Sequence, residues 1–288
     1  MTVHVFVPYL PWPPMARHIT ATPEFADLYL TEESSLMSRR RIAAVLAALI
    51  CFGATIAAAA GHSSDTGDAV WVRGLEPTLP IVARYRFDGP GEAAWSDVSG
   101  NGHTLTPVAG NDGVAALTPH GAGTAVRFPA LCDSEPCPRL ALRSPSTAAL
   151  NPGSRPLRYG ASVLLDPSDT SDGQNVLQKG FSAEGSQYKL QIDGRAAHPS
   201  CALVDTERTI HLAVAGITVA DGSWHAVECR REATALTVLI DGSAQGSARI
   251  PAELSIDNDQ PLSIGAKSAY GDNDQYRGLL DDVWVAIG

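Results

Sequence analysis

The chain has 288 residues, a length that allows one or two domains. Its formal net charge is −10 at pH 7, and residues 61–288 carry all of it. An acidic surface repels phosphate groups, so the charge argues against nucleic acid and anionic lipid as partners.

Residues 1–36 contain four prolines between positions 8 and 14, scattered aromatic residues and no sustained hydrophobic period. A pattern typical of a secretory signal follows at residue 37, and such signals normally start at the beginning of a chain. We therefore expect translation to start at Met37, which would make residues 1–36 a mis-assigned extension. A disordered segment is the alternative.

Residues 37–60 have the order of features that is typical of a secretory signal peptide. Three arginines, Arg39 to Arg41, precede an uncharged apolar stretch that ends in the pattern Ala58-x-Ala60. We expect cleavage before Gly61 and a secreted, extracellular product. The alternative is a retained membrane anchor with an external domain, because the apolar stretch is about long enough to cross a bilayer.

The next segment, residues 61–79, begins as a polar linker, and we expect the folded domain to occupy residues 80–288. Short runs of alternating apolar and polar residues follow, separated by Asp-Gly turns, and no run keeps a helical period of 3.6. The expected strands include 81–87, 124–128, 159–165, 175–179, 188–193, 209–214, a hairpin within 221–242, 261–265 and 279–287.

Because the sequence predicts too few helices to cover the faces of a sheet, two sheets must cover one another. The sequence therefore predicts an all-β fold, an antiparallel two-sheet sandwich of the jelly-roll type. Phe87, Trp224 and Trp284 are the expected large residues of its core.

Four cysteines lie beyond the signal segment: Cys132, Cys137, Cys201 and Cys229. An even number in an exported chain favours disulfides, and three pairings are open. A local bridge suits Cys132 and Cys137, which flank a short turn, and a bridge between strands or sheets suits Cys201 and Cys229. A zinc site is the rival interpretation, but the spacings contain no paired C-x-x-C and no histidine at ligand spacing.

Several segments in order resemble laminin G-like jelly-roll domains of the concanavalin A-like lectin/glucanase superfamily. The hairpin DGSWHAVECRREATALTVLIDG at 221–242 resembles the D-G-x-W-H-x-V and L-x-V-x-V-D-G pieces of these domains. The other similar pieces are Phe87-Asp88, DVSGNGH at 97–103, Gln178-Lys179-Gly180, PLSIG at 261–265 and the segment 278–285. The resemblance implies the fold and does not specify a ligand.

The resemblance also implies a structural calcium ion. First and last strands lie side by side in such domains, which would bring Asp88 near Asp281. The loop at Asn101 and Gly102 can turn carbonyl oxygens inward, because glycine tolerates the required φ. We expect Asp88, Asn101, Gly102 and Asp281 to supply part of the six to eight oxygens that calcium takes. The alternative is that these aspartates only make turns or face solvent.

A second candidate site is the acidic, aromatic-edged segment YGDNDQY at 270–276. Carbohydrate sites pair aromatic rings with a few fixed polar groups. The expected ligand-binding residues are Trp95, Tyr270, Asp272, Asp274 and Tyr276, and Phe181 lies in a similar loop context. The alternative is a solvated hairpin tip.

No catalytic pattern is evident in the sequence. His225 is expected to be a structural residue, and the paired carboxylates of glycosidases, nucleophile elbows, H-E-x-x-H and phosphate loops are absent. We therefore predict a secreted, non-catalytic recognition module that binds a glycan or a cell-surface protein. A glycoside hydrolase-like enzyme of the same fold and a structural cell-envelope protein are the alternatives.

Overall fold

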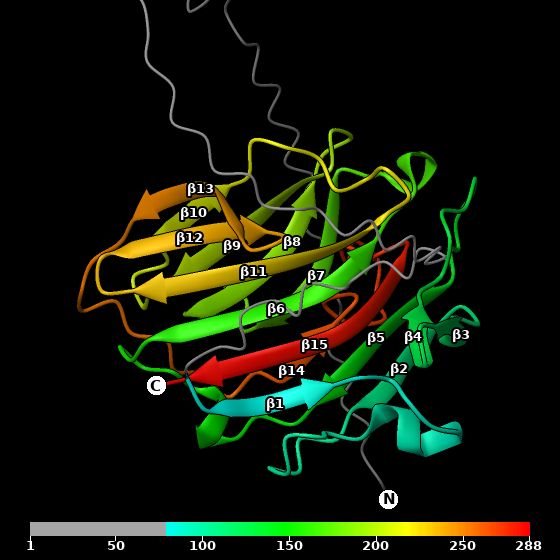
Figure 1. The fold of residues 1–288 in the computed structure, drawn as a ribbon, viewed down its shortest axis with the longest axis horizontal. Coiled ribbons are helices and arrows are strands. Elements are labelled where there is room, and N and C mark those ends of the chain that lie inside the picture. The colour runs from blue at the N-terminus through cyan, green and yellow to red at the C-terminus, as the bar shows by residue number, and fades with distance from the viewer. Residues whose placement is uncertain (1–78) are drawn as a thin grey trace, which may run out of the picture. The chain divides into compact units, whose positions relative to one another are not determined.

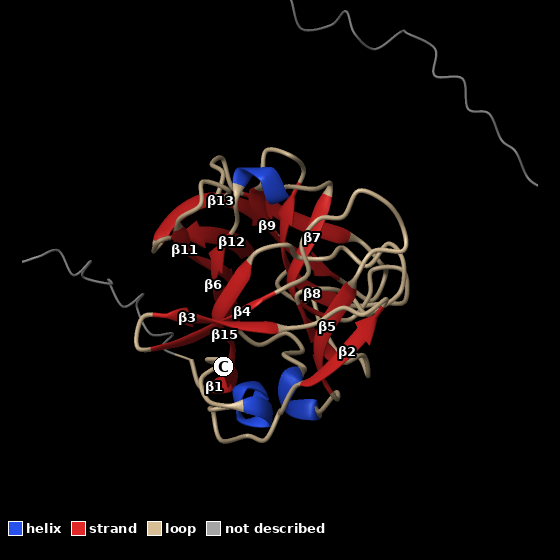
Figure 2. Cartoon of the chain, turned by 90° about the vertical axis from the view of Figure 1, so that its right-hand side faces the viewer, coloured by secondary structure: helices blue, strands red, loops and turns tan. Residues whose placement is uncertain are grey.

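A computed structural model describes residues 79–288, which form two antiparallel β-sheets packed face to face (Figures 1 and 2). The predictions for residues 1–36, for the signal segment 37–60 and for nearly all of the linker 61–79 lie outside the described residues. Within the described part, no helix is long and apolar enough to cross a membrane. The predicted antiparallel sandwich is confirmed.

The first sheet contains eight strands. Its order is β13 (Ser243–Arg249), β12 (Ala235–Ile240), β11 (Trp224–Glu232), β6 (Leu157–Leu164), β15 (Leu279–Ile287), β4 (Gly123–Arg127) and β3 (Ala116–His120), and β1 (Ile81–Tyr85) also pairs with β15. The first and last described strands therefore lie side by side, as the resemblance implied.

The second sheet contains seven strands. Its order is β10 (Ile210–Val214), β9 (His198–Val204), β8 (Gln187–Asp193), β7 (Gly173–Lys179), β14 (Leu262–Ile264), β5 (Arg139–Ser144) and β2 (Thr106–Gly110). The only helical elements in residues 79–288 are the short 3-10 helices η1 (Gly91–Trp95), η2 (Ala148–Leu150) and η3 (Pro167–Asp169).

The core lies between the sheets because alternate residues of each strand point to the same face. On β8, Tyr188, Leu190 and Ile192 are buried in it. Tyr188 meets Tyr159 of β6 across the sandwich, with ring centroids 5.2 Å apart. Both hydroxyls donate to backbone carbonyl oxygens, which satisfies these polar groups inside an apolar core.

Two of the three predicted core aromatics are not core residues. Phe87 is buried, at 1% exposure, but Trp224 and Trp284 are only half-buried. Trp284 lies between Val283 and Val285, which both face the core, so its own side chain points to the outer face. The run VWVAI at 283–287 is apolar on both faces of the strand, so the sequence does not show which of its side chains point inward. The prediction for both tryptophans was wrong.

The structure contains both disulfides that the cysteine spacing favoured. Cys132 bonds to Cys137, and Cys201 bonds to Cys229. Because Cys201 belongs to β9 and Cys229 to β11, the second bridge joins the two sheets through the core. Two disulfides are consistent with an extracellular domain.

His225 has the structural role that the sequence indicated. Its Nδ1 lies 2.8 Å from Asp241 Oδ2, and its Nε2 lies 3.2 Å from Asp221 Oδ1. Burial alone would lower the pKa of His225, but the two carboxylates raise it above its usual value. The side chain therefore links the two Asp-Gly turns at 221–222 and 241–242.

Candidate functional site

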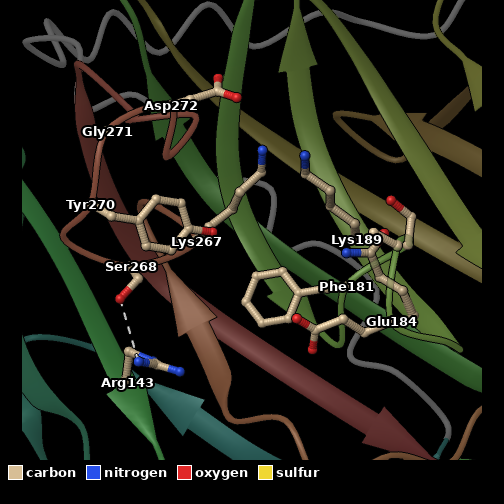
Figure 3. Close-up of a pocket in the computed structure, with 12 residues that line it drawn as sticks. Arg143, Phe181, Glu184, Lys189, Lys267, Ser268, Tyr270, Gly271 and Asp272 are labelled. Carbon is tan, nitrogen blue, oxygen red and sulfur yellow. Dashed lines mark hydrogen bonds between the residues drawn. The ribbon is translucent and has the colours of Figure 1, made fainter. Parts of the chain in front are cut away.

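A cleft of about 630 Å³ lies on the outer face of the second sheet (Figure 3). The β7–β8 loop contributes Phe181 to its lining, and the β14–β15 segment contributes Lys267 and Tyr270. Arg143 of β5 and Lys189 of β8 reach it from the sheet. Their neighbours in sequence, Leu142 and Leu190, face the core, so strand alternation directs Arg143 and Lys189 outward.

Strand pairing extends this lining into a continuous polar row. Ser263 of β14 pairs with Arg143 on one side and with Gln178 of β7 on the other, and Gln178 pairs with Lys189. Neighbouring strands are about 4.8 Å apart, so the four side chains lie next to one another on the outer face. We call Arg143, Ser263, Gln178 and Lys189 the polar row.

The polar row holds hydrogen-bonding atoms that the described part of the chain does not use. Arg143 Nε, Ser263 Oγ and Gln178 Oε1 are buried and have no hydrogen-bond partner among residues 79–288. Ser263 and Gln178 are each 1% exposed. A buried polar atom without a partner costs about 1–3 kcal/mol, so adjacent ones in a folded protein indicate a place where a ligand or water completes the bonding.

Asp274 forms ion pairs with both lysines of the cleft. Its Oδ2 lies 2.9 Å from Lys189 Nζ and 2.9 Å from Lys267 Nζ. Burial alone would raise the pKa of Asp274, but the two lysines lower it below its usual value. Asp274 is therefore a fixed counterion at pH 7.

The segment that carries Tyr270 is closed by its own hydrogen bonds. Lys267 N donates to Asn273 O at 2.9 Å, and Asn273 Nδ2 donates to Ser268 O at 2.7 Å. Tyr270 lies between these contacts and is 50% exposed. We call residues 267–274 the tyrosine loop.

The predicted ligand residues divide into three groups. Tyr270 and Asp272 line the cleft, and Asp274 binds two lysines of its lining. Tyr276 is fully buried, with its ring against Phe128 and its hydroxyl donating to two carbonyl oxygens, so it cannot line a surface site and that prediction is corrected. Trp95 is not part of the cleft.

Trp95 has a different place in the fold. It ends η1 and packs against the core, with its ring edge toward Phe87 at a centroid distance of 6.3 Å. Phe181 does line the cleft. The polar row was missed because its members come from four separate strands, and only their pairing brings them together.

Residues 158–286 match the family of concanavalin A-like lectin/glucanases. This match confirms the resemblance for the segment from β6 to β15. The segment includes Phe181 and Tyr270 of the cleft and Ser263 of the polar row. A search of curated proteins gave no match.

Solved structures share the concanavalin A-like fold at low sequence identity. The binding domain of Paraclostridial Mosquitocidal Protein 1 aligns with a TM-score of 0.55 at 14% identity, over 72% of this chain and 48% of that chain. A second solved structure is domain 4 of AbnA, a GH43 extracellular arabinanase from Geobacillus stearothermophilus, in complex with arabinotriose. It aligns with a TM-score of 0.54 at 14% identity, over 73% of this chain and 93% of that chain.

The binding domain of botulinum neurotoxin DC, solved with SialylT, aligns with a TM-score of 0.52 at 9% identity, over 72% of this chain and 48% of that chain. The alignment thus spans about half the length of the mosquitocidal and neurotoxin chains. At these identities the similarity shows the fold alone.

The residues expected to bind calcium by resemblance to this superfamily are divided between two places. Asn101 Nδ2 donates to the carbonyl oxygens of Ile81 and Val82, at the start of β1. Asp88, beyond the other end of β1, accepts a hydrogen bond from Thr124 N. Four residues of β1 alone span about 13 Å, whereas calcium ligands all lie about 2.3–2.6 Å from one ion.

Asp281 has a partner of its own, because its Oδ2 lies 2.7 Å from His120 Nδ1. Burial raises the pKa of Asp281 more than this contact lowers it. Gly102 has a φ of +79°, which fits the predicted turn, but the loop is closed by Asp97, whose carboxylate accepts from three backbone N–H groups. The structure thus does not bring the four predicted ligands together.

Among residues 79–288, no group of three or more histidine, cysteine, aspartate or glutamate side chains is arranged to hold a metal ion. Backbone and amide oxygens also serve calcium, so calcium binding stays a prediction.

Proposed function

We propose that the protein is a secreted, non-catalytic recognition module that binds a glycan in the cleft between Phe181 and Tyr270. One observation carries the proposal: the two rings line a cleft together with the two ends of the polar row, Arg143 and Lys189. Sugars present hydroxyl groups that donate and accept hydrogen bonds, and apolar C–H faces that pack on aromatic rings. This combination fits the groups that the cleft offers.

The size of the cleft favours a glycan over a protein partner. Its volume of about 630 Å³ lies in the usual range of small-ligand sites, about 300–1,000 Å³, whereas protein partners usually bind broad surfaces. Domain 4 of AbnA, which was solved with arabinotriose, supports the idea that a sandwich of this kind can hold an oligosaccharide.

The carboxylates of the cleft support a non-catalytic role. A glycosidase needs one carboxylic acid that is protonated at the working pH and a second carboxylate about 5–9.5 Å away. Asp274 is held ionised by its two lysines. Glu184 and Asp272 are exposed at the rim, and Glu184 accepts a hydrogen bond from Gln260.

Replacing Tyr270 or Phe181 with alanine is expected to weaken glycan binding about fivefold or more, because a buried aromatic contact is worth more than about 1 kcal/mol. The measurement is a glycan array followed by titration calorimetry. Tyr270→Phe keeps the ring and should stay near wild type. Val114→Ala, at an exposed residue outside the cleft, is the control.

Two results would contradict this proposal. One is that the wild-type protein binds no glycan on the array. The other is that a bound glycan keeps its affinity in both the Tyr270→Ala and the Phe181→Ala variant.

Calcium is a separate proposal, based on the resemblance and on the carbonyl-rich loop at 97–103. A bound ion stabilises the folded state by mass action, so EDTA is expected to lower the thermal unfolding midpoint and added calcium to restore it. Magnesium at the same concentration is the control. An unchanged midpoint would contradict calcium and leave glycan binding intact.

A further inference from the structure

We infer that the cleft selects glycans that carry a carboxylate, and that Arg143 binds this group. The inference rests on the proposed glycan-binding function and adds the class of sugar. The charge balance of the cleft differs from that of the whole chain, whose net charge is −10.

Within residues 79–288, Arg143 is a cation without a counterion. Among the described residues it forms no ion pair, and its one hydrogen bond to a side chain runs from NH1 to Ser268 Oγ at 3.4 Å. Its Nε is buried and has no partner. By contrast, Arg84, Arg139 and Arg158 each pair with a carboxylate of the protein.

The two lysines of the cleft add to this excess of positive charge. Lys189 and Lys267 share the single carboxylate of Asp274, so this group of three keeps one positive charge. Figure 3 shows Arg143 and Ser268 on one side of the cleft and Lys189 and Glu184 on the other. The side of the cleft toward the sheet is therefore cationic.

The acidic residues of the cleft lie at its rim. Glu184 and Asp272 are exposed, whereas Lys189 is only 8% exposed and Arg143 is half-buried. Water and salt screen exposed charges far more than buried ones. An anionic group that enters the cleft is therefore attracted to the floor more strongly than the rim repels it.

The guanidinium of Arg143 matches a carboxylate. Such a group binds the two oxygens of a carboxylate through two parallel N–H donors, and Arg143 lines the cleft, so its terminal nitrogens can supply them. A neutral sugar would leave the charge of Arg143 uncompensated.

The test uses paired glycans. Uronate- and sialate-bearing oligosaccharides are assayed by titration calorimetry beside their own methyl esters, which lack the negative charge and carry one added methyl group. The wild-type protein is expected to bind an acid about tenfold or more tightly than its ester, since a hydrogen bond to a charged group is worth about 1.5–3 kcal/mol. Affinity for the acid should also fall as salt concentration rises.

Arg143→Gln is expected to remove the preference, weakening the acid about tenfold or more and the ester little. Arg143→Lys keeps the charge and the aliphatic stem, so it should fold and give an intermediate loss. Arg249→Gln removes the same charge from an exposed position on β13 of the other sheet and should change neither affinity.

The outcomes separate this inference from the function on which it rests. A wild-type protein that binds an ester as tightly as its acid, with binding still dependent on Tyr270, keeps the glycan proposal and overturns the carboxylate. So does acid binding that survives both Arg143 variants. Binding of sulfated but not carboxylated sugars would assign the cleft to sulfate. Failure to bind any glycan would overturn both.

Discussion

Replacing both Cys201 and Cys229 with alanine is expected to lower the free energy of unfolding by about 3–4 kcal/mol. The bridge closes a sequence separation of 28 and joins β9 of one sheet to β11 of the other. Without it the unfolded chain gains conformational entropy, and the two sheets keep only their packing. Both cysteines are fully buried, so the alanines also leave a small cavity that adds to the loss.

The second disulfide provides a matched control. Cys132 and Cys137 close a separation of only 5, for which the same relation gives about 2 kcal/mol, and neither residue joins the sheets. Urea unfolding of the two double variants, followed by circular dichroism, measures the difference. Equal losses, or a smaller loss for the variant without the inter-sheet bridge, would show that this bridge does not connect the sheets in the way described.

Replacing Arg231 with alanine is expected to cost about 3 kcal/mol or more. Arg231 follows Cys229 on the inward face of β11 and is 1% exposed, so its stem fills part of the core. Its guanidinium donates to the carbonyl oxygens of Gly153 and Leu254, which lie in two different loops. Burial lowers the pKa of Arg231, because the charge has lost its water.

Two further variants separate the contributions of packing and hydrogen bonding at Arg231. Arg231→Met keeps most of the stem, so it should lose only the contacts to the two loops, about 1–3 kcal/mol. Arg230→Ala, at the neighbouring residue that faces outward, should change stability by less than about 1 kcal/mol. The expectation fails if Arg231→Ala unfolds at the same urea concentration as Arg230→Ala.

The strands were predictable because their signals are local. Alternation and Asp-Gly turns identify a strand from about ten residues, and the hairpin at β11 and β12 was predicted in this way. The pairing of Cys201 with Cys229 was also within reach, since both lie in strand-like runs of an exported chain. Side-chain direction was harder where a strand is apolar on both faces, and for that reason Trp284 was wrongly placed in the core.

The candidate site was only half predictable. Tyr270 and Asp272 stand out as aromatic and acidic residues in a loop-like segment, but Tyr276 of the same segment turned out to be buried. Arg143 gives no signal in the sequence, because its neighbours in the polar row are supplied by β14 and β7. A register between distant strands is a property of the folded chain, and a single sequence does not specify it.

The contacts within the tyrosine loop have a consequence for the thermodynamics of recognition. Because Lys267, Asn273 and Asp274 already hold this loop, the backbone that carries Tyr270 is in place before any ligand arrives. Little conformational entropy is then lost on association, so each contact contributes more of its energy to affinity. A preorganised loop of this kind favours binding with little conformational change over binding by induced fit.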